Sequence, residues 1–478
     1  MRVPGKAPSG GNLPHIFVLA LMGPGLSPFG HPMRPHRDAP FFAILLGVSA
    51  SVACTLAEPS TPAGALDTAA ERASGDDDDT NKELAAGSFG EPAAAKGQAA
   101  PGDDVDEDAA LDAPDGTPEA DDPPPPPPSA ERQVVAKLGL GDRFLIGLGN
   151  DAEGGADQMM GYSLEQKLDI HYMYLSGLDW PTWNSPEGAY VTNQANAAKR
   201  RGIVPMFTLY QAAAQGENNL GAFATKNFMT RYWRGVRVMF ERLGELDSPA
   251  IVHVEPDLWG YAQMRGDDPA AVPMLVGSLV PECTGLPENV AGMAKCVIRL
   301  SRAIAPKVVI GLSASSFGAY TNGASDPVRI GSYMTKLGAG DGDITVVETL
   351  DRDAGCFERA IDPLCKRAGK FYWDESNVAH PNFHDHLAWA KAIRKAIGRP
   401  LLWWQMPLGA PSTSGGSAAR YRDNRVRYLF AHPGEFAEAG GIGAVFGTGA
   451  PNQTTIRTDG GQFQKALKGY YAAPAPLP

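Results

Sequence analysis

Eight short apolar runs, separated by stretches of helical character, constrain the fold of this sequence more than any other feature. The runs are rich in β-branched and aromatic side chains, which is typical of buried strands. Strands that alternate with helices, without a GxGxxG turn after the first strand, favour a closed (β/α)8 TIM-type barrel over a doubly wound sheet. The expected strands are Phe144–Leu148, Ile170–Leu175, Ile203–Tyr210, Ile251–Glu255, Val308–Leu312, Ile344–Glu348, Leu401–Gln405 and Ile442–Phe446, and Phe371–Glu375 is a ninth candidate.

The acidic residues of the chain gather ahead of this barrel. Residues 55–132 hold 20 Asp and Glu against 4 Lys and Arg, and they include the proline block Pro123–Pro128. Because this segment has almost no aromatic or β-branched side chains to build a core, we expect a disordered acidic, Pro-rich linker. The total charge of −12, with −16 on the linker and +3 on residues 1–54, leaves +1 on the barrel domain 133–478. This body has no basic face for nucleic acid.

An apolar stretch near the N-terminus indicates export. Phe41–Ala53 is too short to span a bilayer and fits the apolar region of a signal peptide, with basic residues directly after Met33, the expected true start. The sequence Ser51-Val52-Ala53-Cys54 resembles a bacterial lipobox, which implies lipidation of Cys54. We therefore expect residues 1–54 to be a signal region. The exported protein is expected to be a monomer, either anchored to the outer membrane or cell surface as a lipoprotein, or periplasmic or secreted.

The remaining cysteines form two pairs that are close in sequence. In an oxidising compartment, the economical arrangement is two disulfides, Cys283 with Cys296 and Cys356 with Cys365. Neither pair has the CxxC spacing of a zinc site.

Polar and aromatic residues follow the expected strands, at the end where (β/α)8 barrels have their active sites. In the fourth strand, period-two alternation places His253, Glu255 and Asp257 on one face, toward the barrel interior. Such groups are costly to bury unless paired, so we interpret them as functional, with a buried ion-pair network as the alternative. Carboxylates, amides and tryptophans together are typical of a carbohydrate cleft. The expected substrate-binding residues are Asn150, Asp151, His171, Tyr210, Gln211, His253, Trp259, Trp373, Trp404 and Gln405.

Two motifs in this region resemble glycosidase motifs. The clan of (β/α)8 retaining glycosidases has its acid/base Glu at the end of the fourth strand, where Glu255 stands here, although Val254 replaces the clan's Asn. Glu255-Pro256-Asp257 resembles the Glu-Pro-Asp-Ser-Leu motif of glycoside hydrolase family 6, inverting cellulases in which the Asp is the acid. Asp351-Arg352-Asp353 resembles a second motif of that family, in reversed chain order. The resemblance implies a glycoside hydrolase-like enzyme that cleaves a polysaccharide or oligosaccharide without an organic cofactor, and the signal region adds the expectation of export.

Hydrolysis of a glycosidic bond needs a second carboxyl group, about 5 Å or about 6.5 to 9.5 Å from the acid. The retaining clan has its nucleophilic Glu at the end of the seventh strand, where this chain has Gln405. We therefore favour an inverting pair that includes Glu255 or Asp257. If 371–375 is the true seventh strand, Glu375 becomes a candidate nucleophile. The candidate second carboxylates are Glu348, Asp351, Asp374 and Glu375.

Two other functions remain open. Gln405 in place of the clan's Glu is compatible with a non-catalytic carbohydrate-binding or cell-surface lipoprotein on the same barrel. The cluster His380, His384 and His386 is compatible with a metal-dependent hydrolase. Because its spacing matches no HExxH pattern, we favour a helix start capped by Asn382 or Asp385 and predict no metal site.

Overall fold

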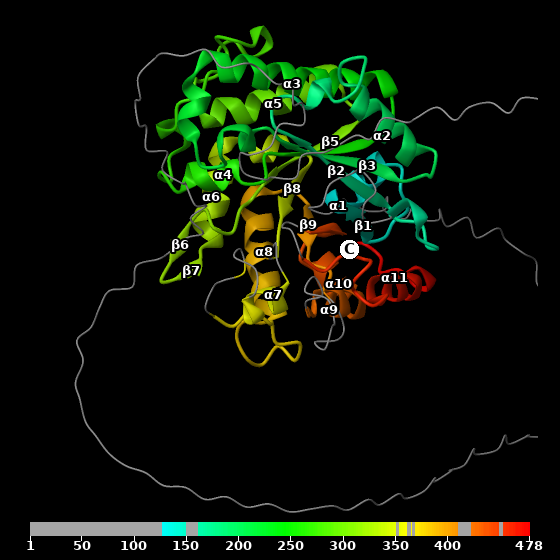
Figure 1. The fold of residues 1–478 in the computed structure, drawn as a ribbon. Helices are drawn as coiled ribbons and strands as arrows, with labels where there is room; N and C mark the ends of the chain where they lie inside the picture. Colours follow the sequence, from blue (N-terminus) through cyan, green and yellow to red (C-terminus); the bar gives the residue numbers. More distant parts are fainter. Residues whose placement is uncertain are drawn as a thin grey trace, which may run out of the picture. The chain divides into compact units, whose positions relative to one another are not determined.

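The computed structural model describes residues 127–149, 161–349, 353–360, 365, 369–409, 422–448 and 453–478. Within them, eight parallel strands close into a barrel in the order β1-β10-β9-β8-β5-β4-β3-β2, and helices pack around it (Figure 1). The predicted (β/α)8 barrel is confirmed. The expected signal region with Cys54, residues 55–126 of the expected linker, and three candidate site residues, Asn150, Asp151 and Asp351, lie outside the described residues.

Every strand of the barrel agrees with its predicted range to within one residue at each end. The range 371–375 is not a strand: Asp374 forms only an isolated bridge to Asn382, because the backbone there turns around the Asp374 carboxylate. A short antiparallel hairpin, β6 Tyr320–Thr321 and β7 Ala324–Ser325, follows the fifth barrel strand. The barrel strands are β1 Leu145–Gly149, β2 Ile170–Ser176, β3 Val204–Tyr210, β4 Ala250–Val254, β5 Val308–Ser313, β8 Ile344–Val347, β9 Leu401–Met406 and β10 Gly441–Phe446.

The helices begin and end at local signals in the sequence. Asn382 caps the helix that follows it: its side chain accepts the N–H of Asp385 at 2.8 Å, and the Asp385 carboxylate accepts the N–H of Asn382. Gly398, with φ of 76°, ends the same helix. The helices are α1 Ala130–Lys137, α2 Ala189–Lys199, α3 Lys226–Leu246, α4 Leu258–Gln263, α5 Val290–Ile304, α6 Pro327–Leu337, α7 Ala354–Arg359, α8 Phe383–Ile397, α9 Arg425–Ala431, α10 Pro433–Glu438 and α11 Gln462–Ala472.

Alternation along each strand separates the barrel interior from the outer layer. On β9, Trp403 packs outward against Phe144 and Phe436, whereas Trp404 faces the interior beside Tyr172 and His253. Both tryptophans are buried. Adjacent aromatic residues of the same type therefore have different roles.

The amino ends of the strands form a closed floor. Lys137 of α1 donates to the carbonyl of Val308 at 2.9 Å, where β5 begins. The N–H of Phe144, directly before β1, donates to the carbonyl of Ala475 in the C-terminal segment. The carboxyl ends of the strands form the opposite end, which we call the mouth.

Two disulfides join the predicted pairs, Cys283 with Cys296 and Cys356 with Cys365. The first connects the middle of α5 to Cys283 in the segment before it, and the second joins α7 to Cys365. No helix in the described part of the chain combines the length and apolar character needed to cross a bilayer.

Candidate functional site

Two carboxyl groups share one hydroxyl at the mouth. The hydroxyl of Tyr210, the last residue of β3, donates to Asp257 Oδ2 at 2.8 Å and also contacts the carboxyl group of Glu217. A phenol has a single proton, so it donates to only one of them at a time. The other contact is a hydrogen bond when that carboxyl group carries the proton itself. This arrangement can hold one protonated and one ionised carboxyl group side by side.

The spacing of these carboxyl groups suits two-carboxyl chemistry. Because Asp257 and Glu217 contact the same oxygen, their nearest oxygens lie at most about 6 Å apart. Glycosidases use separations of about 5 to 9.5 Å between their catalytic carboxyl groups. Both side chains are partly exposed, so a ligand in the mouth can contact them.

Tyr174 of β2 connects this pair to the other side of the mouth. Its ring lies 6.2 Å from that of Tyr210, and its hydroxyl accepts from the side-chain amide of Gln405. Burial raises the pKa of Tyr174, and the nearby carboxylates of Asp257 and Glu348 raise it further. Glu348, which follows β8, therefore lies near the same hydroxyl as Asp257. The Gln405 amide also donates to the carbonyl of Thr448 at 3.2 Å.

An aromatic pair lies next to Glu217. The hydroxyl of Tyr261 on α4 contacts Glu217 Oε2 at 3.4 Å, and the Tyr261 ring lies 5.0 Å from that of Phe317, in the segment after β5. A Cβ atom at position 260 would lie 2.6 Å from the Phe317 ring, so Gly260 permits this close packing. Both rings are half-buried and give the mouth an apolar side.

The barrel interior beneath the mouth contains His253. Its Nδ1 lies 3.4 Å from the hydroxyl of Thr208, and its ring lies 4.7 Å from that of Trp404 in an edge-on arrangement. Burial lowers the pKa of His253 to about 3, so the imidazole is neutral at neutral pH. His253 and Trp404 therefore support the mouth from below as uncharged, buried groups.

Glu255 does not share the face of His253 and Asp257. The backbone φ of 50° at Glu255 interrupts the alternation, and the carboxylate turns back to accept the N–H groups of Gln211 at 3.0 Å and Ala212 at 3.1 Å. This side chain is fully buried beside Tyr232 of α3. Burial raises the pKa of Glu255 to about 8 despite these hydrogen bonds. The expected face of three ionisable groups is therefore reduced to His253 and Asp257.

Three expected substrate-binding residues lie behind the barrel wall, because their side chains leave the backbone on its outer side. Gln211 accepts from the indole N–H of Trp180 at 3.3 Å and donates to the carbonyl of Tyr232. Trp259 is buried and donates to the carbonyl of Val254 at 2.8 Å. His171 is buried, with its ring 4.3 Å from a neighbouring tyrosine ring, Tyr162.

The segment that begins at Trp373 forms a separate cluster. Asp374 accepts N–H groups from Ala379 at 2.7 Å and from two other residues of the same turn, and these bonds lower the pKa of its carboxyl group. Glu375 pairs with Arg427, which lowers the pKa of Glu375. The guanidinium of Arg425 lies 4.2 Å above the Trp373 ring. Each predicted site residue here has a structural partner within the cluster.

The three histidines of the possible metal site have three different partners. His380 lies 2.7 Å from Asp385, and His384 lies 3.4 Å from Glu435. His386 is half-buried and accepts from the indole N–H of Trp403 at 2.8 Å. Over the described ranges, no group of three or more His, Cys, Asp or Glu side chains is placed to hold a metal ion.

A buried ion pair lies next to this cluster, within the segment that leads into α9. Arg425 lies 3.0 Å from Asp423, and both side chains are fully buried. Asp353 accepts the N–H groups of Gly409 and Thr454, which follow β9 and β10. Burial, with Asp423 nearby, raises the pKa of Asp353 to about 8. The network therefore holds connecting segments together.

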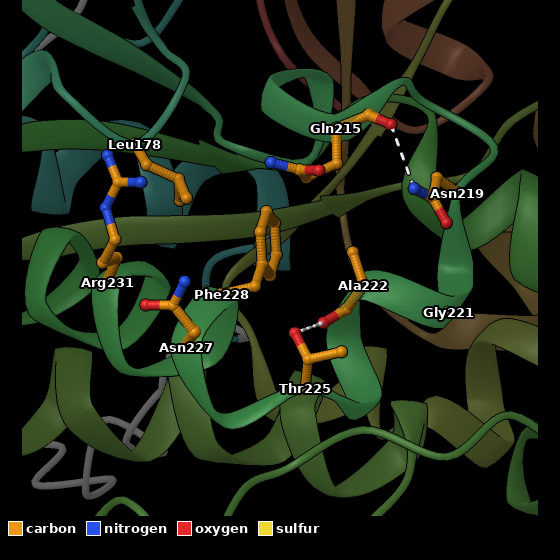
Figure 2. Close-up of a pocket in the computed structure, with 9 residues that line it drawn as sticks. All are labelled: Leu178, Gln215, Asn219, Gly221, Ala222, Thr225, Asn227, Phe228 and Arg231. Atoms are coloured by element: carbon orange, nitrogen blue, oxygen red, sulfur yellow. Dashed lines mark hydrogen bonds between the residues drawn. The ribbon is translucent and has the colours of Figure 1, made fainter. Parts of the chain in front are cut away.

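A separate pocket of about 320 Å³ lies on the side of the barrel formed by β2, β3 and α3 (Figure 2). Its wall comes from Leu178 after β2, from the connection between β3 and α3, and from the first turns of α3. The lining residues are Leu178, Gln215, Asn219, Gly221, Ala222, Thr225, Asn227, Phe228 and Arg231.

Sequence reasoning found Tyr210, Asp257, Glu348 and Gln405, because each ends or directly follows an apolar run. It missed Glu217, Tyr261 and Phe317. Tyr261 lies two residues beyond Trp259, and Phe317 lies five residues beyond Leu312, the expected end of the fifth strand. Neither position marks a site residue by itself, and only the fold brings the two rings together. Glu217 lies among Gly and Asn residues in a connection, where composition alone does not separate it from solvated loop residues.

No protein-family model matches this chain, and no curated protein matches it. Solved structures do resemble it. A β-mannanase from a symbiotic protist of the termite Reticulitermes speratus is 11% identical over 72% of this chain and 92% of that chain, with a TM-score of 0.40. A mannanase from Bacillus subtilis is 11% identical over 73% of this chain and 92% of that chain, with a TM-score of 0.42.

A D-psicose 3-epimerase is also similar, at 9% identity over 69% of this chain and 97% of that chain, with a TM-score of 0.34. The strand order makes the chain a (β/α)8 barrel protein, and mannanases are among the solved structures that resemble it. At these identities the likeness concerns the fold alone, since one barrel fold carries many activities.

Proposed function

We propose that this chain is a glycoside hydrolase-like enzyme that acts on a polysaccharide or oligosaccharide through Asp257 and a second carboxyl group. The observation that carries the proposal is the Tyr210 hydroxyl between Asp257 and Glu217 at the mouth. Glu217 is the preferred second carboxyl group, and Glu348 is the alternative because it lies near the same tyrosine, Tyr174, as Asp257.

In this proposal, protonated Asp257 gives its proton to the glycosidic oxygen as the bond from that oxygen to the anomeric carbon breaks. With Glu348 as the second group, its carboxylate removes a proton from water, and the remaining hydroxide bonds to the anomeric carbon. With Glu217, which lies at about the separation of a retaining pair, the carboxylate itself bonds to the anomeric carbon, and water later displaces it while Asp257 takes a proton from that water. Tyr210 holds the two carboxyl groups in place. Gln405 stands where the retaining clan has its nucleophile, so a retaining reaction here would use Glu217 in its place, and an inverting reaction would use Glu348.

The test measures turnover of a panel of neutral polysaccharides by Asp257→Asn, Glu217→Gln and Glu348→Gln. Loss of an acid or base group is expected to lower kcat by about 10²- to 10⁴-fold. Glu241→Gln, at an exposed position on α3, is the matched control and should keep wild-type activity. Wild-type turnover in all three mouth variants would overturn the proposal.

A non-catalytic carbohydrate-binding protein is the second candidate. It is favoured by Gln405, whose amide is held by Tyr174 and Thr448 at the end of β9, where a nucleophile would otherwise stand. Saturable binding of an oligosaccharide by the wild-type protein, without turnover over long incubation, would select this candidate.

We further propose that the protein is exported and lipidated at Cys54. The two disulfides are compatible with an oxidising compartment. Expression in a Gram-negative host should give a membrane-bound protein whose N-terminal peptide carries an acylated Cys54, and Cys54→Ala should release the protein from membranes. An unmodified Cys54 in the mature protein would exclude the anchor.

A further inference from the structure

We propose that the pocket in Figure 2 is a second binding site, for a neutral sugar unit of the same carbohydrate that enters the mouth. This inference rests on the proposed function in one respect only, the class of ligand. The two sites share one connection, the segment between β3 and α3, which contributes residues to both.

That segment contributes alternate residues to the two sites. Glu217 contacts Tyr210 and Tyr261 at the mouth, whereas Gln215 and Asn219 line the pocket. The positions of Gln215 and Asn219 on either side of Glu217 place part of the pocket lining two residues from the carboxyl pair along the chain. In this proposal, a carbohydrate long enough to cross the connection contacts both sites.

The lining has the groups that bind sugar hydroxyls. Figure 2 shows the side-chain amides of Gln215 and Asn227 around the ring of Phe228, which with Leu178 forms an apolar floor. Within the described chain, neither of these amides makes a hydrogen bond, so their donors and acceptors are available to a ligand. Amides that surround an apolar surface match the alternating hydroxyl and C–H groups of a pyranose ring.

Other polar groups of the lining are already engaged. The Thr225 hydroxyl donates to the carbonyl of Ala222 at 2.8 Å, and the Asn219 amide donates to the carbonyl of Gln215 at 3.2 Å (Figure 2). These bonds hold the backbone of the connection in shape. The pocket wall is thus fixed by its own hydrogen bonds, while Gln215 and Asn227 remain for the ligand.

The charge of the pocket favours a neutral ligand. Arg231 is the single charged side chain of the lining, and its guanidinium lies 2.6 Å from the carboxylate of Asp179. Because this cation is already paired, the pocket offers little attraction for a carboxylate or phosphate. The volume of about 320 Å³ lies at the lower end of the range for ligand sites and fits a mono- or disaccharide unit.

The test measures binding by isothermal titration calorimetry with mannohexaose, cellohexaose and xylohexaose, and with the matching disaccharides. Oligogalacturonide serves as the acidic comparison. The double variant Gln215→Ala/Asn227→Ala removes both free amides from exposed positions, so the fold should be retained and thermal unfolding checks this. Asn218→Ala is the matched control: it lies on the same segment and is exposed, but its side chain pairs with Arg265 outside the pocket.

We expect the double variant to bind the preferred hexasaccharide about tenfold more weakly than the wild type, and Asn218→Ala to bind it equally well. Unchanged affinity in the double variant would overturn the second site while leaving the proposed activity intact. Binding that depends on the pocket, without turnover, would support the site and overturn the activity. Tighter binding of oligogalacturonide, or no binding of any neutral oligosaccharide by the wild type, would overturn the inference.

Discussion

The carboxyl group of Glu255 accepts the backbone N–H of Gln211 at 3.0 Å and thereby ties the end of β4 to the end of β3. A second bond, from the N–H of Ala212, reinforces this link. The Glu of the Glu-Pro-Asp motif thus closes the barrel wall, and the Asp of the same motif faces the mouth. This division of roles leads to the first prediction.

The stability contribution of Glu255 should fall as the pH rises. Burial raises its pKa from an ordinary value of 4.5 to about 8, so the folded state holds a proton that the unfolded chain releases. The contribution is complete below pH 4.5 and is lost as the pH rises to about 8. Denaturant unfolding measures the free energy of unfolding at the low-pH and high-pH ends of this window. Between them, the free energy of unfolding of the wild type should fall by roughly 2 to 4 kcal/mol more than that of Glu255→Gln.

The pKa of Asp353 is raised as well, so Asp353 also makes the free energy of unfolding fall as the pH rises, and it does so equally in the wild type and in Glu255→Gln. The difference between wild type and Glu255→Gln therefore isolates Glu255. Parallel pH dependences in the two proteins would show that Glu255 is ionised in the folded state.

Tyr210→Phe should slow the proposed reaction without unfolding the protein. The substitution removes the hydroxyl between Asp257 and Glu217 but keeps the ring. We expect kcat to fall by about 10- to 100-fold, together with a displaced pH optimum, because the carboxyl pair loses its shared partner. Steady-state kinetics across pH measures both effects.

Tyr333→Phe is the control for this variant, because the buried Tyr333 hydroxyl has no hydrogen-bond partner among the described residues. A wild-type pH profile in Tyr210→Phe would mean that the shared hydroxyl has no part in the reaction.

Phe317→Ala should weaken substrate binding more than it slows turnover. The Phe317 ring packs 5.0 Å from Tyr261 beside Glu217, where a sugar ring can stack on an aromatic face. We expect KM to rise roughly tenfold with kcat nearly unchanged, since stacking of this kind acts in the bound and transition states alike. If KM stays at the wild-type value, the aromatic pair does not contact the carbohydrate.

Asp423→Ala should strongly destabilise the protein. It leaves the fully buried guanidinium of Arg425 without its carboxylate, and breaking such a pair typically costs about 3 to 5 kcal/mol. Glu282→Ala removes the partner of Arg237 in an exposed pair and should cost less than about 1 kcal/mol. Chemical denaturation measures the free energy of unfolding of both variants. Equal decreases in Asp423→Ala and Glu282→Ala would contradict the structural role of the buried pair.

The barrel was predictable because its strands are continuous apolar runs. A strand buried on both faces, such as Val308–Ser313, has an apolar sequence whichever way its side chains point, so its position can be predicted without knowing its orientation. The disulfide pairs were predictable because few cysteines are present and each pair is close in sequence.

The side chains of the site were less predictable, because single backbone angles decide them. Glu255 and Gln405 both have positive φ, 50° and 53°, at the ends of their strands. Period-two alternation does not continue through such a residue, and neither residue is a glycine that would have signalled the change. Asp374 and Glu375 were chosen for their charge, but turn N–H groups and Arg427 already occupy their carboxylates.

The chain enters and leaves the barrel at the floor. Helix α1 packs there through Lys137, and the carbonyl of Leu477, next to the last residue, accepts from Arg132 of the same helix. Purification tags or bead couplings added at either terminus of the barrel domain would therefore be attached at the far end from Asp257. The barrel can be immobilised through these ends for flow-through assays without its opening being blocked.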